Sequence, residues 1–304
     1  MISFRVNVLV GPVCGVAARL RIVIQLNEPL PAPAPIRSFV ALGDSFTEGL
    51  MDTNADGTYR GWADVVAERL DETEPGLLYA NLSVRGKLMR QIEADQIELA
   101  VAMRPDLVSL AGGLNDIARP GCDIEAVCES MERCVRALAP AVGRILMFHS
   151  IDFSHRMPSM NRYRPKAIRL MECVAALREQ YGVVVVDLSA VRAFDDPRLW
   201  AADRVHLNGE GHARIAEAVI ETLGFAARYD WQASLPPAKP QRALVKTWDD
   251  LVWLAKFLVP WIKRRLTGKS SGDGMPPKRP LLEPLRAPAA TSSSASGTAT
   301  AQYD

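Results

Sequence analysis

Residues 38–49 read Ser-Phe-Val-Ala-Leu-Gly-Asp-Ser-Phe-Thr-Glu-Gly, an apolar run followed by a short polar turn between glycines. An apolar run of this length is typical of a buried strand, and open α/β sheets place their functional residues at the carboxyl ends of such strands. Ser45 is therefore a candidate nucleophile. Because a serine hydroxyl is a weak nucleophile, this hypothesis requires a base elsewhere in the chain.

The chain contains four histidines, and His206 lies in the sequence best suited to the role of base. Asp203 stands three residues before it, in a stretch that precedes a predicted helix. This spacing allows the Asp203 carboxylate to reach Nδ1 of the imidazole, which leaves Nε2 free to accept the proton of Ser45. The other histidines are interpreted as polar pocket residues or as structural ones: His149, His155 and His212.

Two further segments supply hydrogen-bond donors for the oxyanion that forms in acyl transfer. A strand-like run from Tyr79 ends at Gly86, whose backbone N–H can approach a ligand closely because glycine has no side chain. A second strand-like run, from Asp106, leads through two glycines to Asn115, whose side-chain amide is a donor. Each residue also has a simpler interpretation, since Gly86 can merely end a strand and Asn115 can cap a helix.

The chain from about residue 37 to 225 resembles the SGNH, or GDSL-like, hydrolase family, which takes its name from four positions. The matching residues stand in Gly-Asp-Ser, at a strand end, in Gly-x-Asn-Asp and in Asp-x-x-His: Ser45, Gly86, Asn115 and His206. By this resemblance Ser45 is the nucleophile, His206 the base and Asp203 the acid that orients the base. The resemblance also implies an oxyanion hole made of two backbone amides and one side chain: Ser45, Gly86 and Asn115.

The first motif departs slightly from the family pattern, because it reads Asp-Ser-Phe-Thr rather than Asp-Ser-Leu-Ser. Phe46 keeps a large apolar residue there, so the expected mechanism stands and only the expected pocket shape changes. The same segment argues against an α/β-hydrolase, whose nucleophile elbow is Gly-x-Ser-x-Gly. Here Thr47 occupies the position of the second glycine.

Apolar runs alternate with helical patterns through this region. The predicted strands cover residues 38–43, 77–83, 106–111, 144–149 and 183–188. The predicted helices cover residues 61–73, 87–102, 123–139, 160–181 and 208–224. Such alternation favours right-handed crossovers and a parallel sheet between two helix layers. We therefore expect an α/β fold, a flavodoxin-like three-layer αβα sandwich with a central five-stranded parallel sheet, as the resemblance also implies.

The predicted hydrolase domain, residues 37–225, is flanked by segments of different composition. These are interpreted as a poorly structured extension, a linker, an apolar helix and a disordered tail: residues 1–36, 226–247, 248–266 and 267–304. Pro260 should interrupt the apolar helix. We expect this helix to dock on the hydrolase domain, with self-association or a membrane surface as alternatives.

Composition limits the partners and the compartment. With 304 residues and a net charge of +1, the chain gives no indication of a nucleic-acid partner. Its five cysteines are an odd number without metal-ligand spacing, which favours reduced thiols and the cytoplasm. The first residues loosely resemble a signal peptide, so secretion is the alternative. We expect no metal and no organic cofactor, and the oligomeric state stays open.

Together these residues predict a serine esterase that hydrolyses carboxylic esters through an acyl-enzyme intermediate. The substrate is expected to be a small-molecule or glycan ester, and acetylated sugars, short acyl esters and lipids all stay open. An acyltransferase or a thioesterase would use the same site, and a non-catalytic binding protein with this fold is a further alternative. The loop Ile151–Pro165 follows a predicted strand, so it is expected either to bind substrate or to be an ordinary connector.

Overall fold

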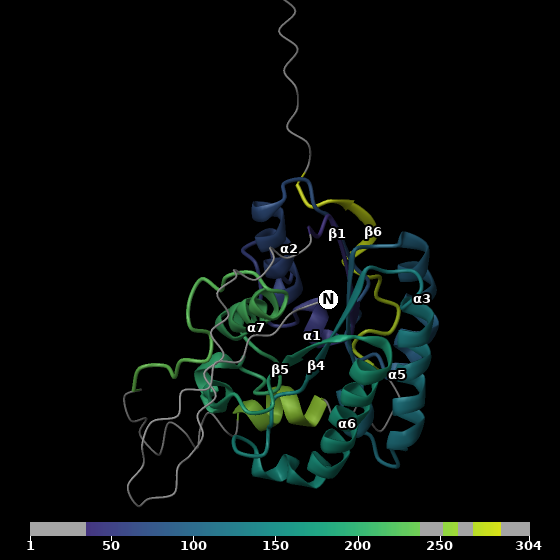
Figure 1. Cartoon of the computed structure of the whole chain (residues 1–304). Coiled ribbons are helices and arrows are strands. Elements are labelled where there is room, and N and C mark those ends of the chain that lie inside the picture. The colour runs from purple at the N-terminus through teal and green to yellow at the C-terminus, as the bar shows by residue number, and fades with distance from the viewer. Residues whose placement is uncertain (1–34, 238–251, 261–269, 287–304) are drawn as a thin grey trace, which may run out of the picture. The chain divides into compact units, whose positions relative to one another are not determined.

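A computed structural model of the chain describes residues 35–237, 252–260 and 270–286 (Figure 1). Several sequence-based expectations lie outside these residues: most of the N-terminal extension with Cys14, the second part of the linker, both ends of the apolar helix and the last part of the tail. The described residues are built around one sheet with helices on both of its faces.

The sheet has six strands among the described residues, in the order β5-β4-β3-β1-β2-β6. Five of them are parallel and match the predicted strands closely: β1 (Ser38–Gly43), β2 (Leu78–Asn81), β3 (Leu107–Ala111), β4 (Arg144–His149) and β5 (Val184–Asp187). Ala41 in β1 lies opposite Asn81 on one side and Ser109 on the other. The carboxyl ends of these three strands therefore meet at one edge of the sheet.

The sixth strand, β6 (Arg279–Pro284), corrects two expectations. It pairs antiparallel with β2, so the sheet has six strands where the sequence predicts five. It also lies within the segment that was expected to be a disordered tail. Its prolines, Pro280 and Pro284, make the segment look disordered in the sequence. A strand at the edge of a sheet accepts proline, however, and β6 is an edge strand.

Five long helices form the two outer layers: α2 (Gly61–Thr73), α3 (Met89–Met103), α5 (Ile124–Leu138), α6 (Arg164–Tyr181) and α7 (Gly209–Thr222). Figure 1 shows α2 and α7 on one side of the sheet and the other three on the opposite side. Side chains alternate along β1 accordingly. Phe39 and Ala41 are buried with the α2–α7 layer, whereas Val40 and Leu42 are buried with the other layer. This confirms the expected three-layer αβα sandwich.

Short helical turns complete the fold at the strand ends and in the connections: α1 (Ser45–Glu48), α4 (Leu114–Ile117), η1 (Pro158–Tyr163), η2 (Arg192–Asp195), η3 (Pro197–Leu199) and the π-helical η4 (Leu254–Leu258). The helix predicted over residues 160–181 begins as the 3₁₀ turn η1 and becomes α-helical at α6. Pro165 lies in the first turn of α6, where its missing N–H breaks no helical hydrogen bond.

The segment after α7 is part of the domain, which corrects the predicted boundary at residue 225. Trp231 is only 6% exposed and belongs to the core under the α2–α7 layer. Its indole N–H donates to Glu221 Oε2 at 2.8 Å, and Arg214 Nη1 donates to the carbonyl oxygens of Trp231 and Ala233 at 3.0 and 2.6 Å. The first part of the predicted linker therefore packs against α7 as part of the domain.

The described part of the predicted apolar helix, residues 252–260, is helical with a π-type turn just before Pro260. Trp253 contacts the hydrolase domain, because its indole N–H donates to the carbonyl oxygen of Asp203 at 2.8 Å. This contact agrees with the expected docking on the hydrolase domain. Within the described part of the chain, every helix is too short or too polar to cross a membrane.

We predict that Trp231→Ala lowers the free energy of unfolding by about 3–5 kcal/mol, because it leaves a cavity and removes an indole hydrogen bond. Tyr229→Ala is the matched control, since this nearby aromatic residue is 41% exposed. The measurement is urea unfolding at fixed pH. Equal destabilisation by the two substitutions would mean that Trp231 is not a core residue of this domain.

Candidate active site

Ser45 lies where β1 ends, at the first position of the short helix α1. Gly43 forms the bend at the end of the strand, and a side chain there would come within 2.4 Å of the Ala111 carbonyl oxygen on β3. Asp44 caps α1 by accepting a hydrogen bond from the backbone N–H of Phe46 at 3.0 Å. Ser45 is 9% exposed and lies in a mostly buried turn.

The structure brings His206 and Asp203 to Ser45. Nε2 of His206 lies 3.0 Å from Oγ of Ser45, and Nδ1 lies 2.5 Å from Oδ2 of Asp203. The second carboxylate oxygen of Asp203 accepts the backbone N–H groups of Val205 and His206, each at 3.0 Å. The hydroxyl, the imidazole and the carboxylate thus form one continuous hydrogen-bonded chain.

The loop that carries His206 is fixed at both ends. Trp200 and Leu207 form an isolated antiparallel bridge, and the backbone N–H of Ala201 donates to the His206 carbonyl oxygen at 2.9 Å. Asn208 then caps α7 by accepting the backbone N–H of Gly211 at 3.0 Å. The imidazole is therefore presented from a closed loop directly before a helix, as the sequence predicts.

The two other predicted oxyanion residues follow the strands on either side of β1. Gly86 lies after β2 with a φ of +75°, a left-handed conformation that favours glycine. Asn115 lies in α4 after β3, and its Nδ2 donates to Asp44 Oδ2 at 3.0 Å and to the Lys87 carbonyl oxygen at 3.2 Å. Asn115 is thus tied both to the residue before Ser45 and to the residue after Gly86.

Comparison with known proteins assigns this part of the chain to a family. The model of the GDSL-like lipase/acylhydrolase family matches residues 41–214, a range that contains every predicted site residue. The chain belongs to this family. As a GDSL-like hydrolase it is an enzyme of the carboxylic-ester hydrolase class.

A curated relative and two solved structures are similar to this GDSL-like hydrolase. An acetylxylan esterase from Geobacillus stearothermophilus is 28% identical over 208 residues, which are 60% of this chain and 92% of the relative. A mutant of Axe2, an acetyl-xylooligosaccharide esterase from Geobacillus, has a TM-score of 0.53 at 22% identity and covers 62% of this chain and 95% of its own. A catalytic mutant of Axe2 with alanine in place of a serine has a TM-score of 0.52 at 21% identity, covering 66% and 97%. These structural similarities show the same fold.

Burial and hydrogen bonding shift the pKa values of Asp203 and Asp44 in opposite directions. Burial is the largest influence on Asp203 and raises its pKa, but the hydrogen bonds from His206 and the backbone outweigh it, so the pKa is lowered overall. Asp44 is fully buried, and this burial raises its pKa to about 6 in spite of the donors from Phe46 and Asn115. The pKa of Asp116, whose carboxylate accepts the backbone N–H of Met89, is also raised by burial.

Glu48 and Arg85 form a supporting pair that the sequence analysis did not identify. Glu48 is the last residue of α1, and its carboxylate accepts the backbone N–H of Arg85 at 2.7 Å and pairs with the Arg85 guanidinium. Since Arg85 directly precedes Gly86, this pair joins the Ser45 turn to the Gly86 turn. Glu48 stands inside the first motif, but nothing in the sequence indicates its partner.

The remaining histidines have other surroundings. His212 is 1% exposed, and burial lowers its pKa to about 3, so it is neutral and accepts the backbone N–H of Trp62 at Nδ1. His149 lies 3.7 Å from Asp187, and His155 lies 4.0 Å from Asp152. The structural interpretation of His212 therefore holds, while His149 at the end of β4 and His155 in the following loop face carboxylates.

The loop Ile151–Pro165 borders the active-site loop through Trp200. The Phe153 ring lies 5.5 Å from the Trp200 ring, and the Arg156 guanidinium stacks on the indole at 3.9 Å. Trp200 precedes Asp203 by three residues, so this loop supports the Asp203 loop from one side. Whether it also binds substrate stays a prediction.

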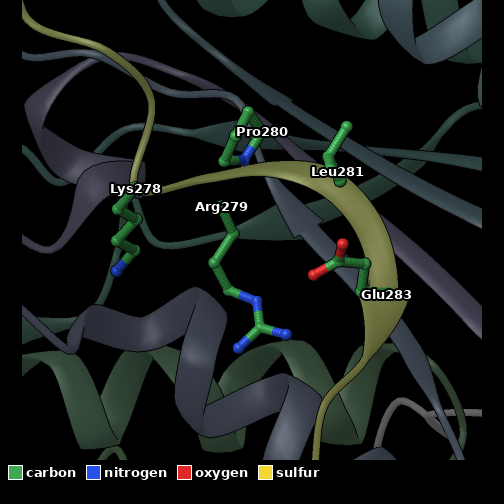
Figure 2. A pocket seen from close by; sticks show the side chains of 5 residues that line it. All are labelled: Lys278, Arg279, Pro280, Leu281 and Glu283. Atoms are coloured by element: carbon green, nitrogen blue, oxygen red, sulfur yellow. The ribbon is translucent and has the colours of Figure 1, made fainter.

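A surface hollow of about 320 Å³ lies along β6 (Figure 2). It is lined by the side chains of one short stretch: Lys278, Arg279, Pro280, Leu281 and Glu283. Within the described parts of the chain, no cluster of three or more His, Cys, Asp or Glu side chains could hold a metal ion. Cys122, Cys128, Cys134 and Cys173 are free thiols.

We predict that the Asp44→Asn variant gains unfolding free energy relative to the native chain as the pH rises from about 4 to 6. Because the pKa of Asp44 is raised to about 6, the folded native chain retains a proton in this range that the unfolded chain has lost. Rising pH therefore destabilises the native chain through Asp44. The Asp44→Asn variant escapes this loss, because its side-chain amide does not titrate. Urea unfolding of both proteins across this pH range measures the difference between their free energies of unfolding. A difference that stays constant with pH would contradict the raised pKa of Asp44.

Proposed function

We propose that this GDSL-like hydrolase is a serine esterase that acts through an acyl-enzyme intermediate, with Ser45 as nucleophile, His206 as base and Asp203 as the orienting acid. The observation that carries the proposal is the continuous chain of contacts between them, 3.0 Å from Ser45 to His206 and 2.5 Å from His206 to Asp203. A nucleophile, a base and an orienting group in this order are what serine hydrolysis requires.

In the first half-reaction, Oγ of Ser45 attacks the ester carbonyl carbon while Nε2 of His206 takes the hydroxyl proton. The resulting tetrahedral oxyanion collapses, the bond to the alcohol breaks, and His206 returns the proton to the leaving alkoxide. In the second half-reaction a water molecule takes the place of the alcohol. His206 removes a proton from this water as its oxygen attacks the acyl carbon, the bond between that carbon and Oγ of Ser45 then breaks, and His206 gives the proton to Oγ, so that the acyl group leaves as a carboxylic acid.

The oxyanion would be held by the backbone N–H groups of Ser45 and Gly86 and by Nδ2 of Asn115. Nδ2 carries two hydrogens and has two acceptors, Asp44 at 3.0 Å and the Lys87 carbonyl oxygen at 3.2 Å. A developing oxyanion would replace the weaker acceptor, Lys87. The bond to the Asp44 carboxylate would persist and keep the amide oriented, which supports its role as a preorganised donor.

The substrate proposed for this site is a short-chain acyl ester of a carbohydrate, with acetyl as the favoured acyl group. The curated relative is an acetylxylan esterase, and this chain covers 92% of its length. The surroundings of Ser45 also favour a small acyl group. Ser45 is only 9% exposed, and Phe46 beside it packs against Phe148 and Trp62 with ring centroids 5.4 and 5.6 Å apart.

We predict that Ser45→Ala abolishes covalent labelling by a fluorophosphonate probe and lowers turnover of p-nitrophenyl acetate by at least about 10³-fold, since loss of a triad member leaves only the residual effect of the oxyanion donors. Peptide mapping of the labelled native chain should place the probe on Ser45. A native chain that takes up no label and shows no turnover would favour the binding-protein alternative.

We also predict that kcat/KM falls steadily from p-nitrophenyl acetate to the butyrate and octanoate esters, because each added methylene must enter the closed surroundings of Ser45. Acetylated xylo-oligosaccharides should release acetate, which can be measured directly. A maximum at octanoate would instead point to a lipid substrate. Faster transfer of acetyl to an added alcohol than to water would point to an acyltransferase.

A further inference from the structure

The C-terminal segment of the chain returns to the active site after leaving the part that matches the family. The family match ends at residue 214, whereas the described C-terminal residues are 252–260 and 270–286. The second of these, named here the C-terminal arm, adds β6 to β2 and is held further by the backbone N–H of Leu285, which donates to the Leu77 carbonyl oxygen at 2.8 Å. Figure 1 shows the arm in yellow at the edge of the sheet.

Lys278 attaches the arm to the end of the Ser45 turn. Its ammonium nitrogen lies within hydrogen-bond distance of four acceptors, which share its three N–H donors: the carbonyl oxygens of Glu48 at 2.7 Å, Tyr59 at 3.1 Å and Arg60 at 2.6 Å, and Asp64 Oδ2 at 2.5 Å. The side chain is 21% exposed, and from its place directly before β6 it extends in the same direction as Arg279 (Figure 2). Three backbone carbonyls and one carboxylate thus converge on a single cation from the arm.

The place where Lys278 binds is the junction between α1 and α2. The backbones touch there, since a side chain on Gly49 would come within 2.5 Å of Gly61. Glu48 contributes its carbonyl oxygen to Lys278 and its carboxylate to the backbone N–H of Arg85. The ammonium of Lys278 therefore fixes the residue that links the Ser45 turn to the Gly86 turn.

The arm also packs directly on the Gly86 turn. The Ser270 hydroxyl lies 2.2 Å from the position that a side chain on Gly86 would take. Gly272 is buried, and a side chain there would come within 2.0 Å of the Arg85 carbonyl oxygen. These two contacts leave the Gly86 turn little room to move away from Ser45.

The helical segment 252–260 contacts the loop that carries Asp203. The Trp253 indole N–H donates to the Asp203 carbonyl oxygen at 2.8 Å, and the Arg204 guanidinium lies 5.2 Å from the centre of the Trp253 ring. Arg204 has a φ of +62°, a left-handed conformation that a residue with a side chain adopts only when its surroundings hold it there. Trp253 is therefore part of what fixes the Asp203 loop.

We propose that the described C-terminal residues, 252–260 and 270–286, form a positioning element of the active site, in which Lys278 fixes the Ser45 and Gly86 turns and Trp253 fixes the Asp203 loop. Neither residue touches the reacting atoms. The inference rests on the proposed function, because it concerns the geometry of the same triad. A small displacement of either turn lengthens the Ser45–His206 contact or withdraws the Gly86 amide, and displacements of about 1 Å cost up to about 10²-fold in rate.

The experiment uses three full-length variants. Lys278→Met removes the ammonium and keeps most of the stem, and Trp253→Phe removes the indole N–H and keeps an aromatic ring. Leu281→Ala is the matched control, since Leu281 lies in β6 three residues after Lys278 and is 59% exposed. For each protein, kcat and KM for p-nitrophenyl acetate and the rate of fluorophosphonate labelling are measured at a temperature well below its melting temperature.

We expect Lys278→Met to lower kcat and the labelling rate by about 10- to 100-fold with KM changed by less than about twofold, because a positioning residue acts on the transition state. Trp253→Phe should lower kcat by several-fold, and Leu281→Ala should match the native chain. If Lys278→Met does not fold, Trp253→Phe decides the question on its own.

A native rate in both test variants, with only a lowered melting temperature, would overturn the proposal and leave the segment a purely stabilising role. Failure of the proposed function has a different signature. In that case the native chain itself would take up no label at Ser45, and the positioning role would fall with it.

Discussion

The 3.0 Å contact between Ser45 and His206 is the interaction on which the rest of the site depends, and it joins residues 161 positions apart. Local structure alone cannot create it. Ser45 is set by the end of β1 and the start of α1, whereas His206 is set by the loop that closes at the Trp200–Leu207 bridge. The two meet because α7, which follows His206, packs on α2, which follows the Ser45 turn. The sheet, the packing of α7 on α2 and the closure of the His206 loop thus together determine the distance between Ser45 and His206.

The acids around this contact show how one fold gives similar groups different roles. Asp203 receives the imidazole and two backbone N–H groups, and these donors hold its carboxylate ionised against the effect of burial. Asp44 has one backbone and one amide donor and is fully buried, so its pKa is raised to about 6. In the proposed mechanism, Asp203, which has the stronger donors, is the acid that balances a positive imidazolium. The other orients a neutral amide, for which a weaker acceptor is sufficient.

The sequence predicted the parts of this site that carry a local signature. The parallel strands were marked by apolar runs, Ser45 by a turn between glycines, and His206 by an aspartate three residues earlier. Glu48, Lys278 and Trp253 carry no such signature. Lys278 binds the Glu48 carbonyl across 230 positions, and Trp253 binds the Asp203 carbonyl across 50. Backbone carbonyls are present at every residue, so no pattern of side chains marks which of them a distant lysine or tryptophan will find.

The strand β6 was missed for a related reason, and its composition suits the position it occupies. A sheet that ended at β2 would leave the backbone groups of that strand open to pairing with another chain. β6 covers them and becomes the edge in turn. Pro280 and Pro284 lack N–H donors, so the new edge is a poorer template for a further strand than β2 would be. The prolines that make this segment look disordered in the sequence are thus the residues that suit it to the edge of the sheet. The strand β6 also begins directly after Lys278. Protection of the sheet edge and attachment to the Ser45 turn are therefore coupled in one short segment of chain.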